Sequence, residues 1–172
     1  MVEKLVGYLI GLFSNLFNLP FGKEITVFII SLMPVLELRG GLIAASLLKL
    51  NPITSYIIAI LGNIIPVPFI LWFGSVLLNW MRRTKWLSSF AKFLDNKVEK
   101  KKDQIEKYGF WGLVLFVGIP LPGTGAWTGC LIAAVLNMDK KKAFLAASLG
   151  ILIASIIMMF ISFGLLKHII GG

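Results

Sequence analysis

Three stretches of this chain contain no charged residue, and each is long enough to cross a lipid bilayer as a helix. They run from Pro52 to Met81, from Tyr108 to Met138 and from Ala143 to Leu166. About 20 apolar residues in a row cross the roughly 30 Å of hydrocarbon. Hydrophobic residues make up 58% of the chain, against about 45–50% in soluble domains. The sequence therefore predicts an all-α integral membrane protein.

The positive charges predict which segments face the cytoplasm. The net charge is +9, and basic residues cluster in 82–107 and at Lys140, Lys141 and Lys142. Cytoplasmic loops of membrane proteins carry an excess of Lys and Arg, so we expect both segments on the cytoplasmic side. Because the basic residues border membrane segments, the charge indicates contact with membrane lipids and no nucleic-acid partner.

An internal repeat divides the chain into two similar halves. Shifting the sequence by 88 residues aligns 27–62 with 115–150 without a gap, and Pro34 then meets Pro122 while Gly41 meets Gly129. Interrupted hydrophobic segments in corresponding positions of two halves are typical of secondary transporters. The predicted domains are 1–22, an N-terminal amphipathic or short membrane helix; 23–81, the first repeat; 82–107, a cytoplasmic amphipathic basic linker; and 108–172, the second repeat.

Each repeat predicts a re-entrant hairpin followed by a transmembrane helix. A short apolar arm, a Pro/Gly break, a second short arm and a long helix follow one another in both halves. An arm of about 12 residues rises only about 18 Å, so two arms enter and leave a bilayer on one side. The predicted segments are 25–36, 34–41, 40–50 and 53–80 in the first half, and 109–120, 120–129, 126–138 and 141–167 in the second.

The cytoplasmic segments predict that the two hairpins enter from opposite faces. A second hairpin that starts at the linker and returns to the same side keeps Lys140–Lys142 in the cytoplasm, as the charge rule requires. The helix 53–80 separates the first hairpin from that side, so the tips would meet near the midplane as an inverted repeat. Ordinary full spans are the alternative. Residues 2–18 predict one amphipathic helix, ended by Pro20 and Gly22.

The first break contains the candidate chemistry. Glu37 and Arg39, followed by Gly40 and Gly41, are the only ionisable residues in this apolar region. Intramembrane ionisable residues are functional candidates by default, and irregular backbone at this depth must line a cavity or be buried in protein. We interpret Arg39 as the ligand of an anionic group and Glu37 as a proton-binding residue. The alternative is a structural ion pair.

The second break offers hydroxyl and backbone groups without charge. Thr124 is the predicted N-cap of the following arm, and the N-termini of both second arms would favour an anion. Asn63, close to Pro66 and Pro68, could line the pathway or sit in a packed kink. The candidate residues of the second break are Pro122, Gly123, Thr124, Gly125, Trp127 and Thr128.

Enzyme chemistry has little support in this sequence. There is no HExxH or GxSxG motif, no carboxylate pair at membrane depth, and the single Cys130 excludes an internal disulfide and a cysteine-based metal site. We therefore expect no catalytic activity, no cofactor and no metal site.

The motifs "ELRGG" (37–41) and "IPLPGTGAWTG" (119–129) resemble the small multidrug export proteins, a family of small prokaryotic membrane proteins. The resemblance covers roughly 25–166. It implies a relation to the wider DedA/VTT-like superfamily, two re-entrant hairpins, a prokaryotic plasma membrane, and transport or scrambling of lipids. DedA members are implicated in recycling undecaprenyl phosphate with the proton motive force. They usually carry an arginine in the second hairpin, where this chain has Trp127 or Thr128.

These observations predict a small secondary transporter, proton-coupled through Glu37, that moves an amphipathic anionic lipid-like substrate such as a polyprenyl phosphate. The alternatives are an exporter of cationic drugs, an energy-independent lipid scramblase and a membrane scaffold. Because the chain is small for an alternating-access machine, we expect a homodimer.

Overall fold

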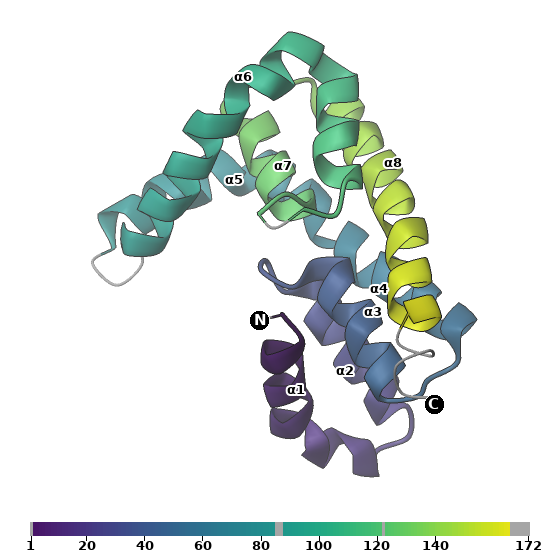
Figure 1. The fold of residues 1–172 in the computed structure, drawn as a ribbon. Coiled ribbons are helices and arrows are strands. Elements are labelled where there is room, and N and C mark those ends of the chain that lie inside the picture. Colours follow the sequence, from purple (N-terminus) through teal and green to yellow (C-terminus); the bar gives the residue numbers. More distant parts are fainter. Residues whose placement is uncertain (1, 85–87, 122, 166–172) are drawn as a thin grey trace. The chain divides into compact units, whose positions relative to one another are not determined.

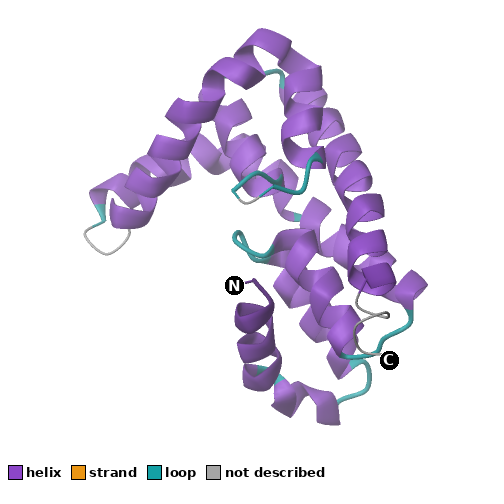
Figure 2. Cartoon of the chain, in the orientation of Figure 1, coloured by secondary structure: helices purple, strands orange, loops and turns teal. Residues whose placement is uncertain are grey.

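The computed structural model describes residues 2–84, 88–121 and 123–165, where every regular element is a helix (Figures 1 and 2). The predicted all-α class is confirmed for these residues. The helices are α1 (Val2–Leu12), η1 (Ser14–Asn18), α2 (Gly22–Leu32), α3 (Glu37–Leu47), α4 (Pro52–Ile64), α5 (Pro66–Arg83), α6 (Ser88–Gly118), α7 (Ala126–Val135), α8 (Lys140–Met159) and the π-helix η2 (Phe160–Leu165).

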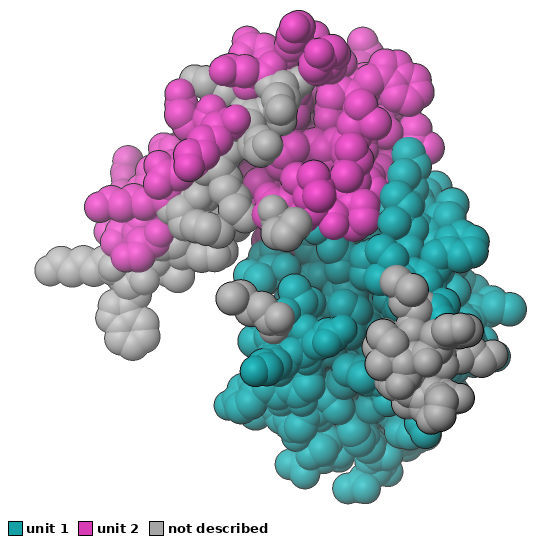
Figure 3. Space-filling view, in the orientation of Figure 1, with its two compact units in different colours: residues 1–65, 152–172 teal, residues 66–151 magenta. Residues whose placement is uncertain are grey.

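The chain forms two compact units, residues 1–65 with 152–172 and residues 66–151 (Figure 3). Both long apolar segments pass from one unit into the other, the first at the junction of α4 and α5 and the second within α8. Two helices of the described chain are long and apolar enough to span a membrane, Pro52–Val76 and Lys140–Gly164. These spans agree with the predicted membrane protein.

In the first unit, α2 and α3 form an antiparallel hairpin and α4 packs against both. Glycines allow this close approach. A Cβ atom at Gly41 would lie 1.8 Å from the Ser31 hydroxyl oxygen, and one at Gly62 would lie 2.8 Å from the Phe28 carbonyl oxygen. The buried apolar side chains of the hairpin and α4 include Val27, Ile30, Leu38, Leu42, Ala44, Ala45 and Ala59.

The second unit repeats this use of glycine. The end of α6 and α7 form its hairpin, and α5 packs against α7. A Cβ atom at Gly129 would lie 2.9 Å from a methyl carbon of Val117, and one at Gly150 would lie 2.6 Å from the Cβ atom of the same valine. Gly129 and Gly150 stand 88 residues after Gly41 and Gly62, so equivalent glycines pack against the first arm of each hairpin.

The second arms of the two hairpins also end alike. Lys49 after α3 and Asn137 after α7 both have a left-handed backbone, with φ of 56° and 51°. In each case the next amide returns to a carbonyl five residues earlier, a common way to satisfy the last carbonyls of a helix. These hydrogen bonds run from Leu50 N to Ala45 O and from Met138 N to Ala133 O, each 3.0 Å.

The caps of α4 and α8 continue the correspondence. The Asn51 side chain accepts from the Thr54 amide at 3.2 Å, and the Asp139 side chain accepts from the Lys142 amide at 2.9 Å. Both pairs again differ by 88 residues. A run of matched hydrogen bonds therefore supports the internal repeat found in the sequence.

The N-terminal region departs from the prediction of one helix over 2–18. α1 ends at Leu12 and a 3₁₀ turn, η1, follows. The side chains of Ser and Asn in η1 compete with helical hydrogen bonds, which explains the early end of α1. Gly22 begins α2 rather than ending the preceding helix, and its Cα lies so close to the Leu16 carbonyl that a Cβ atom would be 1.8 Å from that oxygen.

The long predicted helices are interrupted at proline and glycine. The segment 53–80 is split at Ile65 into α4 and α5, just before Pro66. The linker helix and the first arm of the second hairpin are joined as α6, with non-helical backbone at Gly109 (φ 54°, ψ −124°).

Candidate functional site

The first hairpin tip is built by a proline that stops α2. Met33 has extended backbone (ψ 139°), the conformation that a following proline favours. The Glu37 amide then donates to the Met33 carbonyl at 2.9 Å, and α3 starts at Glu37. The first turn of α3 therefore begins directly at the tip.

Glu37 combines burial with an unusual backbone. Its side chain is only 6% exposed, and its φ is 52°. This left-handed region costs a non-glycine residue roughly 1–2 kcal/mol. The residue 88 positions later is Gly125, which also has positive φ, 145°. Where the second hairpin uses glycine, the first one places a buried carboxylate.

Arg39 lies in the same first turn of α3 as Glu37. The arginine is half-buried, and the Glu37 carboxylate is close enough for the two charges to interact. The sequence suggested that a non-helical stretch would hold both residues. In the structure the left-handed φ of Glu37 departs from helical backbone, whereas Arg39 lies in the helical first turn of α3. The positive end of the α3 dipole lies beside both residues.

Gly40 and Gly41 serve close packing. A Cβ atom at Gly40 would lie 2.6 Å from the Leu36 Cβ atom, and one at Gly41 would strike the Ser31 hydroxyl. Both glycines allow α3 to lie close to α2, because larger residues would push the two helices apart.

The predicted N-cap role of Thr124 is wrong. The N-cap of α7 is Gly125, and the Thr124 hydroxyl lies 2.9 Å from the carbonyl oxygens of Ile119 and Leu121. Thr124 lies one residue before the N-cap of α7, and Gly125 has a ψ of −179°. The Thr124 side chain therefore points to the turn before α7 and not to the α7 amides. Thr124 therefore closes the proline-rich turn after α6.

The other residues of the second tip frame the start of α7. Gly123 has a φ of 86° and is exposed, whereas Thr128 in the first turn is 8% exposed and Trp127 is half-buried. Pro122 lies outside the described residues. The described part of this tip has no charged side chain, in contrast to the first.

Asn63 is buried near the end of α4. It is 2% exposed, and its side-chain oxygen has no hydrogen-bond partner within the described chain. The sequence identified this residue because it is polar, lies in an apolar helix and precedes two prolines.

Several hydroxyl contacts of the first unit were missed by the sequence reasoning. The Ser155 hydroxyl lies 3.0 Å from the Tyr56 hydroxyl, and the Ser46 hydroxyl donates to the Ser162 carbonyl at 2.7 Å. Ser155 and Ser162 are seven residues apart, a spacing that predicts one face of a regular α-helix. That spacing is the sequence pattern from which a polar face on this apolar helix could have been predicted.

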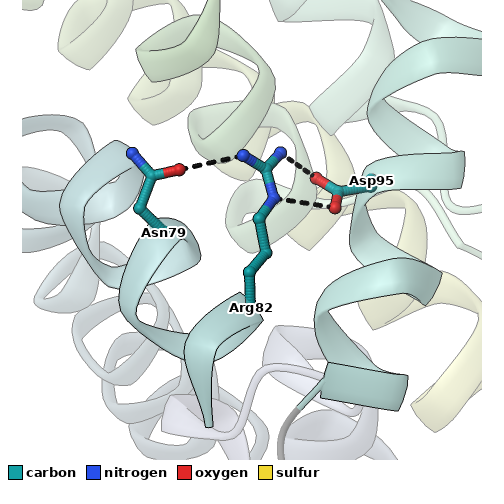
Figure 4. Close-up of polar contacts among 3 residues, drawn as sticks. All are labelled: Asn79, Arg82 and Asp95. Carbon is teal, nitrogen blue, oxygen red and sulfur yellow. Dashed lines mark hydrogen bonds and ion pairs between the residues drawn. The ribbon is translucent and has the colours of Figure 1, made fainter.

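A polar cluster outside the apolar spans joins α5 to α6. The Arg82 guanidinium donates to the Asp95 carboxylate, with a distance of 2.9 Å from Nε, and to the Asn79 side-chain oxygen at 2.9 Å (Figure 4). The hydrogen bonds with Asp95 raise the pKa of Arg82 above its ordinary value. Because both side chains are substantially exposed, this pair contributes at most about 1 kcal/mol.

Residues 37–157 match the family described as "Putative small multi-drug export protein". The match covers more than two thirds of the chain and includes the residues from Glu37 to Gly41 of the first tip and the whole of the second tip. No curated protein matches the chain, and no solved structure does.

Proposed function

Because the chain belongs to this small multi-drug export family, we propose that it is a small secondary transporter whose substrate site lies at the first hairpin tip. The observation that carries the proposal is Glu37. A buried carboxylate in left-handed backbone costs folding free energy twice, through desolvation and through backbone strain. Such strained residues cluster at functional sites, and a transporter has a use for a buried group that binds and releases a proton.

The surroundings of Glu37 favour an anionic head group. Arg39 supplies a positive charge beside it, and α3 directs its N-terminus at the same place, where backbone amides and the helix dipole attract anions. The apolar helices would accommodate a hydrocarbon tail. We therefore propose a DedA-like substrate, an amphipathic anionic lipid such as a polyprenyl phosphate. Proton exchange at Glu37 would couple its movement to the proton gradient.

The hairpins are proposed to be re-entrant and inverted with respect to each other. α3 and α7 have 11 and 10 residues, about 15–17 Å, which reaches only half of the hydrocarbon layer. The inverted arrangement rests on the charges, because a second hairpin that returns to its own side keeps Lys140–Lys142 on the face where it enters, and the apolar segment 53–80 separates the first hairpin from that face.

That face is proposed to be the cytoplasmic side of a prokaryotic plasma membrane, together with the basic linker 82–107. A homodimer remains our proposal for the assembly, because one chain offers few helices between which access could alternate.

The test is transport of a labelled polyprenyl phosphate in proteoliposomes, with and without a proton gradient. We expect gradient-dependent movement by the wild type and movement at background level by Glu37→Gln, which keeps the shape but cannot exchange a proton. Equal movement by both proteins, independent of the gradient, would contradict proton coupling and indicate a scramblase. A complete lack of movement would indicate a different substrate or a scaffold.

The family description itself favours a second candidate, export of drugs. A cationic drug would pair with Glu37, but the neighbouring Arg39 charge would repel it. Efflux of a cationic dye by the same proteoliposomes separates the two candidates. Dye efflux that survives in Arg39→Gln, with no movement of lipid phosphate, would favour the drug exporter.

A further inference from the structure

The turn that leads into α2 presents an aromatic side chain on a strained backbone. Phe21 has a left-handed φ of 60°, an unfavourable conformation for a residue other than glycine, and its side chain is 75% exposed. Leu19, two residues earlier, is 54% exposed. The described part of the first unit thus covers little of the Phe21 ring, so packing within that unit does not offset the strain.

Short contacts hold residues 19–21, which we call the 19–21 turn, in one conformation. The Gly22 amide donates to the Leu19 carbonyl at 3.0 Å, and the Ile25 amide donates to the Phe21 carbonyl at 2.9 Å. Gly22 lies so close to η1 that a Cβ atom would overlap the Leu16 carbonyl oxygen. The fold therefore fixes the position of the exposed Phe21 ring at the start of α2.

The 19–21 turn lies level with one end of a membrane segment of the same unit. α2 and α3 have 11 residues each and pack against each other as an antiparallel hairpin, so the start of α2 and the end of α3 lie at the same end of it (Figure 1). The apolar span that begins at Pro52 follows closely after α3. This is the level at which the hydrocarbon of a bilayer meets the lipid head groups.

The chain around the turn has the polarity of a segment in the membrane interface. Residues 5–22 contain no charged side chain, whereas Lys4 precedes them and Lys23 follows them. α1 has 11 residues, about 16 Å, which is too short to cross the roughly 30 Å of hydrocarbon. It also leaves Tyr8 and Leu12 exposed. A short helix with an exposed apolar face is typical of an element that lies in the interface.

We propose that the 19–21 turn inserts Leu19 and Phe21 into the lipid leaflet at the open end of the first hairpin, with α1 lying along the surface of that leaflet. The partner of the turn is the acyl region of the bilayer. Burial of a phenylalanine ring among acyl chains is favourable by at least as much as its left-handed backbone is unfavourable. Insertion therefore explains why a strained position carries a large apolar side chain.

Insertion of the turn would also set the depth of Glu37. In the proposed re-entrant hairpin α2 crosses one leaflet, and its 11 residues rise about 16 Å, close to half of the hydrocarbon layer. A turn held at the edge of the hydrocarbon thus keeps Glu37, beyond the other end of α2, near the midplane. This consequence rests on the proposed function, whereas insertion of the turn does not.

The experiment attaches a nitroxide spin label to single cysteines of the full-length protein in phosphatidylcholine vesicles. Cys130→Ala first removes the native cysteine. In Phe21→Cys and in Leu19→Cys we expect the label to be more accessible to oxygen than to a water-soluble nickel chelate, because oxygen concentrates in hydrocarbon. Lys23→Cys is the matched control, because Lys23 is exposed in the first turn of α2 and its label should be more accessible to the nickel chelate.

Labels in the 19–21 turn that are as accessible to the nickel chelate as the label at Lys23 would overturn the proposal. Leu19 has ordinary extended backbone (φ −91°, ψ 148°), so its variant keeps the test decisive if Phe21→Cys does not fold. Spectral broadening at position 21 that disappears on dilution with unlabelled protein would also overturn the proposal, because a second copy would then cover the turn in place of lipid.

A further variant separates the Phe21 ring from the backbone that carries it. Asparagine tolerates left-handed backbone, so Phe21→Asn keeps the turn and removes the apolar ring. The label at Leu19 should then shift toward the head groups, with a lower ratio of oxygen accessibility to nickel accessibility. An unchanged ratio would overturn the role of Phe21 in insertion.

A label at Val35, which is exposed at the first hairpin tip, distinguishes failure of this proposal from failure of the proposed function. We expect this label to lie deep in the hydrocarbon. An inserted turn with the Val35 label at the level of the head groups would leave insertion standing and remove the re-entrant hairpin. A deep Val35 label with the 19–21 turn in water would do the reverse.

Discussion

The second arms of the two hairpins match in their backbone hydrogen bonds, but the tips from which they start differ in chemistry. Each second arm begins at a residue with positive φ, and each ends in the same pair of hydrogen bonds. The first tip puts Glu37 and Arg39 at this position, whereas the second has Gly125 followed by Ala126 and Trp127. Matched scaffolds with unmatched side chains indicate that the scaffold explains the fold, and that the function has to be sought in the charged tip.

The largest expected effect comes from replacing Glu37 by the residue that the other tip uses. Glu37→Gly and Glu37→Gln should both lower transport to background, since neither exchanges a proton. Glu37→Gly should unfold at a higher temperature than Glu37→Gln, by a free energy of about 1–2 kcal/mol, because glycine accepts left-handed backbone. The measurement is proteoliposome transport combined with thermal unfolding.

Equal stability of these two variants would contradict backbone strain at the tip. Transport that survives in both would contradict the role of the carboxylate and return Glu37–Arg39 to a structural ion pair.

The next largest effect tests the packing beneath the tips. Gly41→Ala should destabilise the protein by about 1–3 kcal/mol, because the added methyl collides with the Ser31 hydroxyl. Gly129→Ala should cost less, since its nearest neighbours are flexible methyl groups of Val117 and Leu113. Thermal unfolding measures both.

Gly7→Ala in α1 is the control for the glycine series, because nothing lies within 4 Å of a Cβ atom there. We expect it to be neutral or to stabilise by about 0.5–1 kcal/mol, the usual gain for alanine over glycine in a helix. A loss of stability at Gly7 as large as at Gly41 would mean that the glycines matter through helix propensity and not through contact.

A smaller effect is expected at the caps that start α4 and α8. Asn51→Ala and Asp139→Ala should each cost about 1 kcal/mol, because each removes a side-chain acceptor of helix amides. Similar losses would extend the correspondence of the two halves to their energetics. If one of the two substitutions left the unfolding temperature unchanged, the two halves would be alike in geometry but not in energetics.

The smallest effect concerns the left-handed residues after the second arms. Lys49→Gly should stabilise by up to about 1 kcal/mol. Asn137→Gly should gain only a few tenths, since asparagine tolerates this backbone. Both residues are exposed, so the loss of buried side-chain contacts does not contribute to the difference in unfolding temperature. A larger gain at Asn137 than at Lys49 would contradict this ranking.

The sequence predicted those parts of the fold that depend on apolar length and on proline. The charge-free stretches predicted helices throughout, and Pro34 predicted the end of α2. The pair Pro66 and Pro68 predicted a kink in one long helix, where the structure has a division into α4 and α5. The 88-residue repeat aligned 27–62 with 115–150, which pairs Asn51 with Asp139, but the roles of these two residues as caps came only from the structure.

Other features could not be predicted because they depend on contacts between distant residues. The left-handed backbone of Glu37 is set by the tight turn from Met33, and nothing in the letters "ELRGG" indicates it. Thr124 was misplaced by one residue, since a cap depends on the exact helix start, which is the least certain feature of a sequence-based prediction. The contact of Ser46 with Ser162 joins residues far apart in the chain and has no local signal.

The backbone of Glu37 has a consequence for how such a protein evolves. A glutamate codon becomes a glycine codon by a single base change, and at this position the change would also relax the fold. Mutation and stability thus act in the same direction, against the glutamate. In a lineage grown where transport brings no advantage, position 37 should therefore drift to glycine early, well before the packed glycines at 41 and 129 begin to change.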